Sequence, residues 1–407
     1  MEIHPLYIIV ILLLVLLIPY VYIRLSYGFW YHQPVFHIYD LHYYLFPCGI
    51  IDKELPQKNR YTNLDKVQTT FFDKINKSYK FSRFVNFIRT HYLRNGNNEY
   101  LPTKKNISPY FYGHKHPSFI TFYNEPHLIQ DNKTTDIISD KKTIGVMTAR
   151  PLHVTIYNGS NDAVFYAYYV DFLCIDKEYR KKGVAPEIIQ THYFNQRRMN
   201  KKVFVDLFKR EGDLTGIVPL CVYSTYGFNI QNWIRPHILA PEYNLIEITS
   251  KNIVYLLDFM KMNVCTLFDI SITPELSNVL QLIKTNNYII YILLDTSLPE
   301  EHKVLSAYFF KNTSLSITKN SKCISSIASI KDKETSNYFF IEGFKLSLFT
   351  MKTKFPFLLM EEISHNSVII DNLKLDNIPF FVSPTAYFFY NFAYNTFNSK
   401  KVLIIGD

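Results

Sequence analysis

The 407-residue sequence contains only five cysteines and no C-x-x-C pair. Because the five are odd in number and far apart, they predict neither a zinc site nor a disulfide framework, and a reduced compartment is the simpler interpretation. The sequence also lacks an H-E-x-x-H motif, a G-x-S-x-G motif and a Walker loop, and it contains no low-complexity tract or short repeat. We therefore expect no bound metal ion.

Charged residues are also scarce, at 19% of the chain against 48% hydrophobic residues, which is the balance of a folded globular protein. The length allows two domains of ordinary size. The formal net charge of +9 favours an anionic partner such as nucleic acid, a membrane surface or a phosphorylated cofactor. Tyr and Phe are abundant throughout, so the mixture of basic and aromatic residues is no specific sign of nucleic acid, and we expect no nucleic-acid partner.

Residues 6–23 carry no charge and are almost wholly Leu, Ile and Val. Eighteen helical residues span about 27 Å, close to the roughly 30 Å of a bilayer core. A removable signal peptide would need a basic start, whereas residues 1–5 contain Glu2 and no Lys or Arg. We therefore expect residues 1–24 to be a retained single-pass anchor. Arg24 and the basic body that follows predict that the rest of the chain faces the cytosol.

The remainder of the chain predicts a mixed α/β fold in two halves. A polar segment at 57–98 has helical spacing, and 184–198 and 253–260 also read as helices. Short apolar runs predict strands at 144–149, 154–157, 163–175, 203–205, 289–294, 338–341 and 368–370. Pro151 and the pair Asn158-Gly159 predict turns.

A basic loop lies between a predicted strand and a predicted helix and reads Arg180-Lys181-Lys182-Gly183-Val184-Ala185. A helix N-terminus offers backbone N–H groups and a positive dipole end to a phosphate. Gly183 lets the backbone approach closely, and the flanking cations favour an anion. A solvated basic loop that caps a helix would give the same pattern, so this short motif is weak by itself.

Four longer segments give the motif a context. They read F-W-Y-H-Q-P-V at 29–35, I-G-V-M-T-A-R-P at 144–151, D-F-L-C-I-D-K-E-Y-R-K-K-G-V-A-P-E-I-I at 171–189 and Y-F-F-Y-N-F at 387–392. They are similar, in the same order, to F-W-x-T-Q-P-V, V-G-F-I-S-A-I-P, N-F-L-C-V-H-K-K-L-R-S-K-R-V/L-A-P-x-L-I and Y-Y-L-Y-N-W of the protein N-myristoyltransferase family. Fifteen residues follow Phe392, as fifteen follow the family's tryptophan. The chain therefore resembles this branch of the GNAT acyltransferase superfamily.

The resemblance implies two tandem GNAT-like halves in a pseudo-twofold arrangement. We expect residues 25–245 to bind acyl-CoA and residues 246–407 to complete a peptide groove, although residues 245–380 are strongly diverged. The implied activity is transfer of a long-chain acyl group, myristoyl in this family, from acyl-CoA to an N-terminal glycine of a protein. Such an enzyme has acyl-CoA as its co-substrate, and we expect it to act as a monomer.

The resemblance also assigns site residues. The acyl-CoA site would comprise Gly28, Phe29, Trp30, Leu173, Cys174, Ile175, Arg180, Lys181, Lys182, Gly183, Val184 and Ala185. The backbone N–H groups of Phe172 and Leu173 would form an oxyanion hole at a strand bulge, a site where N–H groups can be freed from the ladder. The terminal α-carboxylate of Asp407 would be the catalytic base. Tyr387 would help to bind the substrate.

Two departures from the family leave alternatives open. Asp171 replaces an Asn, so an extra carboxylate could hold or deprotonate the substrate ammonium, or pair with a lysine. Thr215 and Gly216 are the counterparts we assign to a family Thr and Gly that would contact the substrate, across an alignment with gaps. A catalytically inactive membrane scaffold and a GNAT-like acetyltransferase for small amines remain the alternative functions.

Overall fold

The computed structural model describes residues 15, 17–18, 20–25, 28–93, 99–130, 137–159, 161–212, 216–233, 236, 239–297, 302–318 and 321–406. Among these residues no helix has both the length and the apolar character needed to cross a membrane. Most of the segment 6–23 lies outside the described residues, so the membrane anchor stays a prediction.

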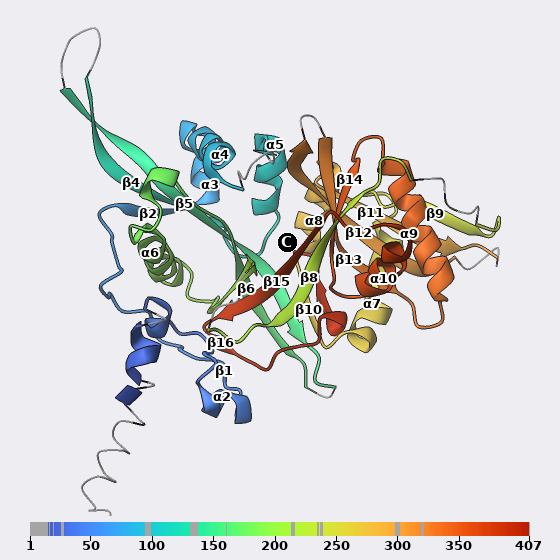
Figure 1. Ribbon diagram of the computed structural model, residues 1–407, viewed down its shortest axis with the longest axis horizontal. Helices are drawn as coiled ribbons and strands as arrows, with labels where there is room; N and C mark the ends of the chain where they lie inside the picture. Colours follow the sequence, from blue (N-terminus) through green and yellow to red (C-terminus); the bar gives the residue numbers. More distant parts are fainter. Residues whose placement is uncertain are drawn as a thin grey trace, which may run out of the picture.

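Helices cover both faces of one large sheet (Figure 1). The helices are α2 (Leu41–Leu45), α3 (Phe72–Ile75), α4 (Tyr79–His91), α5 (Lys104–Ile107), α6 (Val184–Met199), α7 (Ile253–Leu267), α8 (Leu276–Lys284), α9 (Asn337–Met351) and α10 (Asn366–Asp376). Single 3-10 turns are η1 (Trp30–His32), η2 (Ser108–Phe111), η3 (Lys177–Tyr179) and η4 (Ser399–Lys401).

The strands of the described part form a 15-stranded mixed sheet and a separate pair, β1 with β16. The main path of the large sheet runs β17-β10-β5-β6-β7-β15-β8-β14-β13-β12-β11-β9. The strands are β1 (Gly49–Ile50), β2 (Val67–Phe71), β3 (Glu99–Tyr100), β4 (Phe119–Gln130), β5 (Ile137–Ile156), β6 (Ala163–Ile175), β7 (Val205–Glu211), β8 (Cys221–Asn229), β9 (Tyr243–Glu247), β10 (Ile270–Thr273), β11 (Tyr288–Asp295), β12 (Lys303–Thr318), β13 (Ser321–Lys331), β14 (Phe357–Glu361), β15 (Phe381–Tyr390), β16 (Phe392–Ala393) and β17 (Val402–Ile404).

Helices α4 and α6 cover opposite faces of β4, β5 and β6. Alternation along β4 sends Phe122 to the core under α4 and Tyr123 to the core under α6. In the second half α7 covers one face of β11 and β12, and α9 covers the other. Strand β11 is buried over seven of its eight residues, which explains its nearly continuous apolar sequence. The predicted α/β class is confirmed.

The path of the sheet crosses the boundary predicted near residue 245. Strand β15 lies between β7 and β8, and β10 and β17 extend the sheet beyond β5. The last described residues therefore run into the middle of the molecule, where the C-terminal end is marked (Figure 1). Gly406 lies against the side chain of Leu152, and the backbone carbonyl of Ile405 accepts a hydrogen bond from the Tyr288 hydroxyl.

Three sequence-based elements are wrong. Pro151 makes no turn, because β5 runs unbroken from 137 to 156 and pairs Pro151 with Tyr168. The run 338–341 lies in α9, where Phe340, Phe344 and Leu348 bury one helical face. The run 368–370 likewise lies in α10. Apolar runs of three or four residues fit either period, and the Ser336 cap before α9 was the signal that would have separated them.

Candidate active site

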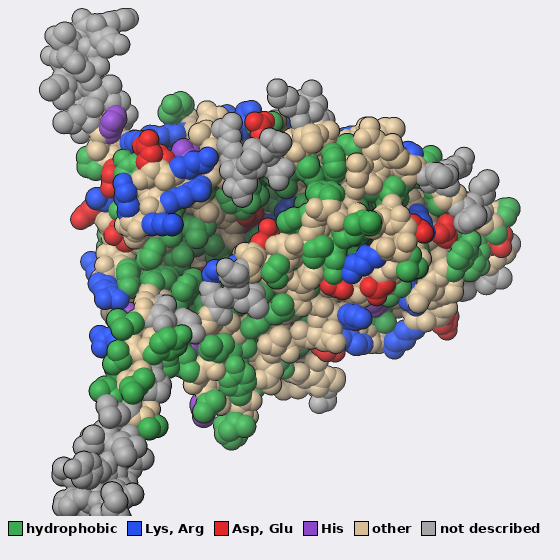
Figure 2. Space-filling view, viewed as in Figure 1, with side chains coloured by type: hydrophobic (Ala, Val, Ile, Leu, Met, Phe, Trp, Pro, Cys, Tyr) green, Lys and Arg blue, Asp and Glu red, His purple; other side chains and the backbone are tan. Residues whose placement is uncertain are grey.

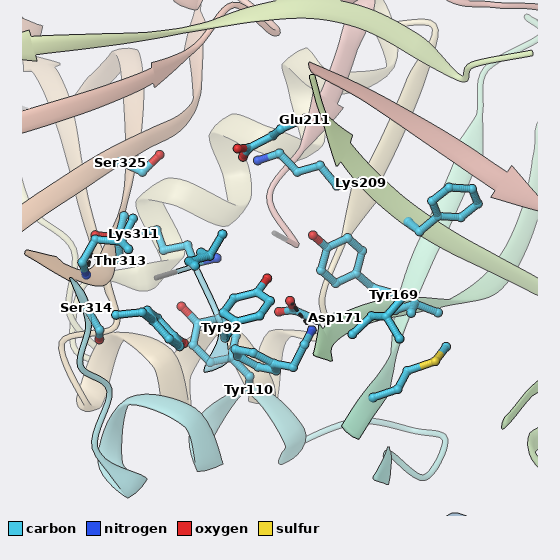
Figure 3. A pocket seen from close by; sticks show the side chains of 18 of the residues that line it. Tyr92, Tyr110, Tyr169, Asp171, Lys209, Glu211, Lys311, Thr313, Ser314 and Ser325 are labelled. Carbon is cyan, nitrogen blue, oxygen red and sulfur yellow. Dashed lines mark hydrogen bonds between the residues drawn. The ribbon is translucent and has the colours of Figure 1, made fainter. Parts of the chain in front are cut away.

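A cavity of about 470 Å³ lies in the middle of the sheet and is lined by residues from both halves. Its volume is within the roughly 300–1,000 Å³ of small-molecule sites. Asp171 and Tyr92 lie beside one another near its centre, with Lys311, Thr313 and Ser314 on one side (Figure 3). In the space-filling view the surface is hollowed near the middle, and Lys and Arg side chains gather beside the hollow, around α4 (Figure 2).

The cavity lies where two parallel strands separate. The ladder between β6 and β7 ends at the pair Val170 and Phe208. Alternation along β7 then places Asp206 and Phe208 on one face of the sheet and Lys209 and Glu211 on the other, yet all four line the cavity. The cavity therefore reaches both faces of the sheet through this gap.

We name its two sides by the elements behind them. The α6 side comprises Trp30, Met147, Val170, Ile189, His192, Tyr193, Asp206, Phe208 and Tyr390. The β12–β14 side comprises Lys209, Glu211, Thr225, Lys311, Asn312, Thr313, Ser314, Leu315, Ser325, Leu359 and Glu361. The first side is mainly apolar and aromatic, and the second is mainly polar and charged.

A β-bulge in β6 lies between the two sides. The ladder with β5 moves from Thr148 opposite Asp171 to Val146 opposite Cys174, so two residues of β6 face one of β5. Phe172 adopts a φ of +51°, which is uncommon for a side chain with a Cβ. The bulge predicted at Phe172 and Leu173 is therefore present, and both residues line the cavity.

The N–H of Phe172 is already used. It donates a hydrogen bond to Oδ1 of Asp171 at 2.7 Å. The carboxylate of Asp171 therefore competes with any other acceptor for this donor. The ring of Phe172 packs among Phe84, Tyr92 and Tyr100, which holds the bulge in place.

The basic loop before α6 has the geometry expected of an anion cradle. Lys181 and Gly183 both have positive φ, of +63° and +81°, and α6 begins at Val184. No described atom would lie within 4 Å of a Cβ placed on Gly183, so the space in front of the helix N-terminus is open. Arg180 is held back from this space, because its guanidinium donates to the carbonyls of His91 and Ile175.

Of the predicted site residues 28–30, Trp30 is the one that lines the cavity. Trp30 lines the α6 side and stacks on Phe208 with ring centroids 5.8 Å apart. Phe29 supports it from behind in an edge contact at 5.1 Å. Gly28 and Phe29 do not line the cavity themselves.

The β12–β14 side contains a buried ion pair. Nζ of Lys209 lies 2.8 Å from Oε1 of Glu361, and the Tyr223 hydroxyl donates to the other carboxylate oxygen at 2.6 Å. Both charged side chains are largely buried. A buried pair of this kind holds its geometry well, because leaving either charge alone would be costly.

Four further predicted site residues, like Gly28, Phe29 and the loop 180–185, do not line the cavity. Tyr387 is fully buried beneath it, against Tyr223. The backbone carbonyl of Gly216 accepts a hydrogen bond from the N–H of Ile38, and Gly216 does not line the cavity. Cys174 and Ile175 pack against β5, and burial raises the pKa of the Cys174 thiol to about 12. The roles assigned to these four residues stay predictions.

Thr215 and Asp407 lie outside the described residues, so the roles assigned to them stay predictions. In the part of the chain that is described, no group of three or more His, Cys, Asp or Glu side chains is arranged to hold a metal ion.

The sequence did not reveal the polar residues of the β12–β14 side. Lys209 and Glu361 are 152 residues apart, and nothing local to either one marks it as part of a site. On the α6 side, His192 and Asp206 also carry no local mark, because the predicted helix 184–198 contains many other polar residues and Asp206 directly follows the predicted strand 203–205.

Comparison with known proteins rests on structure. A scan against models of protein families finds no match, and a search of curated proteins finds none either. Among solved structures, N-myristoyltransferase of Saccharomyces cerevisiae with bound myristoyl-CoA is similar at a TM-score of 0.70 and 12% identity, over 94% of this chain and 92% of that one. A second structure of that enzyme with myristoyl-CoA gives 0.68 and 12%, over 92% and 94%. A third, with inhibitors as well, gives 0.66 and 12%, over 94% and 96%.

At this identity the likeness concerns the fold. The chain has the fold of N-myristoyltransferase over nearly its whole length, and the fold expected from the four motifs is confirmed.

Proposed function

We propose that this protein is an acyltransferase that moves a long-chain acyl group from acyl-CoA to the N-terminal glycine of a protein or peptide. One observation carries the proposal: the bulge of β6 lies at the centre of a cavity that joins the two sides of an N-myristoyltransferase fold. The yeast enzyme binds myristoyl-CoA on this fold, which supports the same class of donor here.

The α6 side suits the donor. Its aromatic and aliphatic side chains match an acyl chain, and the N-terminus of α6 with Lys181 and Lys182 matches the phosphates of CoA. The β12–β14 side suits a polar acceptor, since it offers hydroxyl, amide and charged groups. The thioester would then lie at the bulge, between the two.

The reaction is a direct aminolysis. The acceptor α-amine, with a pKa of about 7.7–8.0, must lose a proton before it attacks the thioester carbon. A C–N bond forms, which leaves a positive charge on the nitrogen and an oxyanion that accepts a hydrogen bond at the bulge. The nitrogen then loses its extra proton as the C–S bond breaks, and the released CoA thiolate takes up a proton. No covalent enzyme intermediate is needed.

Two carboxylates are candidates to bind and to deprotonate the α-amine of the acceptor. We assign binding of the substrate ammonium to Asp171, which lines the cavity beside the bulge. Proton acceptance stays assigned to the terminal carboxylate of Asp407. Adding one residue after Asp407 should abolish most turnover while donor binding persists, and full activity of the extended chain would remove Asp407 from the mechanism.

The decisive test is an incubation of the purified protein with tetradecanoyl-CoA and a peptide that starts with glycine. Mass spectrometry should show one added acyl group on the peptide α-amine. The same peptide with an acetylated N-terminus is the control and should stay unmodified. Absence of any acylated product, with tetradecanoyl-CoA bound, would count against an enzyme.

One observation favours the non-catalytic alternative. Because Asp171 occupies the N–H of Phe172, the predicted oxyanion hole has lost one donor in this structure. A scaffold protein could tolerate that loss. The assay above separates the two functions, since a scaffold would bind partners without forming product.

We also propose that residues 6–23 anchor the protein in a membrane. The described residues in and just after this stretch are helical, and Val15, Leu17 and Ile18 expose most of their apolar surface. Deleting residues 1–24 should release the protein from membranes and leave turnover in detergent unchanged. Retention of the shortened protein on membranes would reject the anchor.

A further inference from the structure

A line of polar side chains is buried behind the α6 side of the cavity. Oγ1 of Thr121 lies 2.9 Å from Oγ1 of Thr69 and 2.7 Å from Nδ1 of His192. Nε2 of His192 lies 2.7 Å from Oε1 of Gln196, whose amide donates to Oδ1 of Asp206 at 2.5 Å. Thr121, His192 and Gln196 are completely buried, and Asp206 is 5% exposed.

The hydrogen bonds in this line have a fixed order. Burial lowers the pKa of His192 to about 4, so the ring is neutral and carries a single N–H. The amide of Gln196 donates to Asp206, so its oxygen must accept from Nε2 of His192. Nδ1 then accepts from the hydroxyl of Thr121. Each group before Asp206 is therefore satisfied within the line.

Asp206 is the last residue of the line, and its second carboxyl oxygen, Oδ2, forms no hydrogen bond within the line. Among the residues that the structure describes, no hydrogen bond to its Oδ2 and no ion pair is found. The neighbouring Arg197 directs its guanidinium to backbone carbonyls such as that of Val203, at 3.2 Å. Burial raises the pKa of Asp206 to about 7, so both the acid and the carboxylate are present at neutral pH.

This end of the line faces the cavity. Asp206 and His192 both line the α6 side, next to Ile189, Tyr193 and Phe208. A plain hydrocarbon chain placed there would leave the carboxyl oxygen without a partner, which is unfavourable in a buried site. A hydroxyl group fits better, because it can donate to the carboxylate and can also accept from the acid.

We propose that the α6 side binds an acyl chain that carries a hydroxyl group, and that this hydroxyl forms a hydrogen bond with Asp206. The inference rests on the proposed acyl transfer and narrows its donor class. Asp206 is thus a specificity residue for the donor, and Gln196 and His192 are positioning residues that fix its orientation.

The test is a competition within one reaction. Tetradecanoyl-CoA and an equal amount of one hydroxytetradecanoyl-CoA isomer are supplied with a glycine-starting peptide, and the isomers are taken one at a time along the distal half of the chain. Mass spectrometry gives the ratio of the two products, which does not depend on the fraction of protein that is folded. We expect one isomer to be preferred by about 10- to 100-fold, the effect of one buried hydrogen bond to a group that can be charged.

Asp206→Leu should reverse this ratio in favour of the plain chain, and Asp206→Asn should reduce it. The matched control is Glu342→Gln, because Glu342 is a buried carboxylate of α9 that does not line the cavity, and its ratio should equal that of the unaltered protein. Preference for the plain chain with every isomer, or an unchanged ratio in Asp206→Leu, would overturn the inference while leaving acyl transfer intact. No product from any donor would overturn the proposed function itself, and the inference with it.

Discussion

The two sides of the cavity satisfy their polar groups in different ways. On the β12–β14 side, Lys209, Glu361 and Tyr223 form a network in which both carboxylate oxygens have partners. On the α6 side, the line from Thr69 to Asp206 leaves one carboxyl oxygen over at the cavity wall. A network with paired charges supports the fold, whereas a line that stops at a cavity is arranged to meet a ligand.

The difference also concerns how each side is built. The α6 side takes most of its residues from β6, α6 and β7, which follow one another along the chain. The β12–β14 side brings together strands from distant parts of the chain, and only their pairing creates it. Changes on the second side should therefore affect stability first, and changes on the first side should affect donor binding first.

The largest effect should come from breaking the ion pair. Lys209→Met leaves Glu361 buried without its counter-charge, which we expect to lower the free energy of unfolding by about 3–5 kcal/mol. Urea unfolding measures this loss. Lys303→Met is the matched control: Lys303 is half exposed and pairs with Asp332 and with the exposed Glu334, so its loss should cost less than about 1 kcal/mol. Equal losses in both variants would contradict the assigned role of the buried pair.

The pH dependence of stability should reveal Asp206. Its pKa is raised from the usual 3.8 to about 7 by burial, so the native state holds the proton more tightly than the unfolded chain. Stability should thus fall as pH rises from about 4 to about 7, by roughly 4 kcal/mol for this group alone. In Asp206→Asn this fall should be absent.

His192 acts in the opposite direction, because its pKa is lowered and it destabilises the fold when pH drops below about 6.5. The unaltered protein and Asp206→Asn both retain His192, so the difference between their urea midpoints reports the contribution of Asp206 alone. A difference that stays constant from pH 4.5 to pH 8 would show that Asp206 is ionised throughout and would weaken the contrast between the two sides.

A smaller effect should come from filling the space in front of α6. Its control variant separates a loss of donor binding from the cost of backbone strain. Gly183→Val places a branched side chain in the open space before α6, and we expect affinity for acyl-CoA to fall by at least about 10-fold. Gly159→Val is the control, because Gly159 also has a positive φ, of +76°, with no described atom within 4 Å of a Cβ. Both variants should lose about 1–2 kcal/mol of stability, and only the first should lose donor affinity. Isothermal titration with tetradecanoyl-CoA measures the donor affinity of each variant.

The smallest effect should be on binding of the acceptor peptide. Asp171→Asn replaces a charge-assisted hydrogen bond to the substrate ammonium by a neutral one, which should raise the KM for the peptide by about 10-fold with little change in kcat. The KM for acyl-CoA should not change. Asp65→Asn, at an exposed position, is the control. A loss confined to kcat would instead make Asp171 the proton acceptor.

The sequence predicted the fold class and the unit from Asp171 to Ile189, because every feature of that unit is local. Gly183 at the end of the basic loop, the cations beside it and the apolar spacing of α6 can all be read along the chain. It failed at Pro151, where a proline is tolerated in β5 because, on the side away from β6, the ladder with β4 ends at Ala149 and the ladder with β10 begins at His153. It also failed at 338–341 and 368–370, where runs too short to show a period were read as strands.

The roles of Thr215 and Gly216 were assigned by alignment across gaps and stay predictions, whereas the sequence did not single out Lys209 and Glu211, which line the cavity. No local pattern distinguishes these two residues from an exposed charged strand end. Their place at the cavity depends on β15, a distant part of the chain that pairs with β7 and carries the sheet on to β8 and β14.

By itself, then, the sequence determined the short-range features: which segments are helix or strand when their period is long enough, and where an anion can meet a helix N-terminus. The tertiary structure alone decided which strands pair, and so which carboxylates are buried, which one has a partner and which one faces the cavity. The physical reason is that burial and hydrogen bonding depend on every neighbour that the fold brings together, whereas a local pattern contains only the neighbours along the chain.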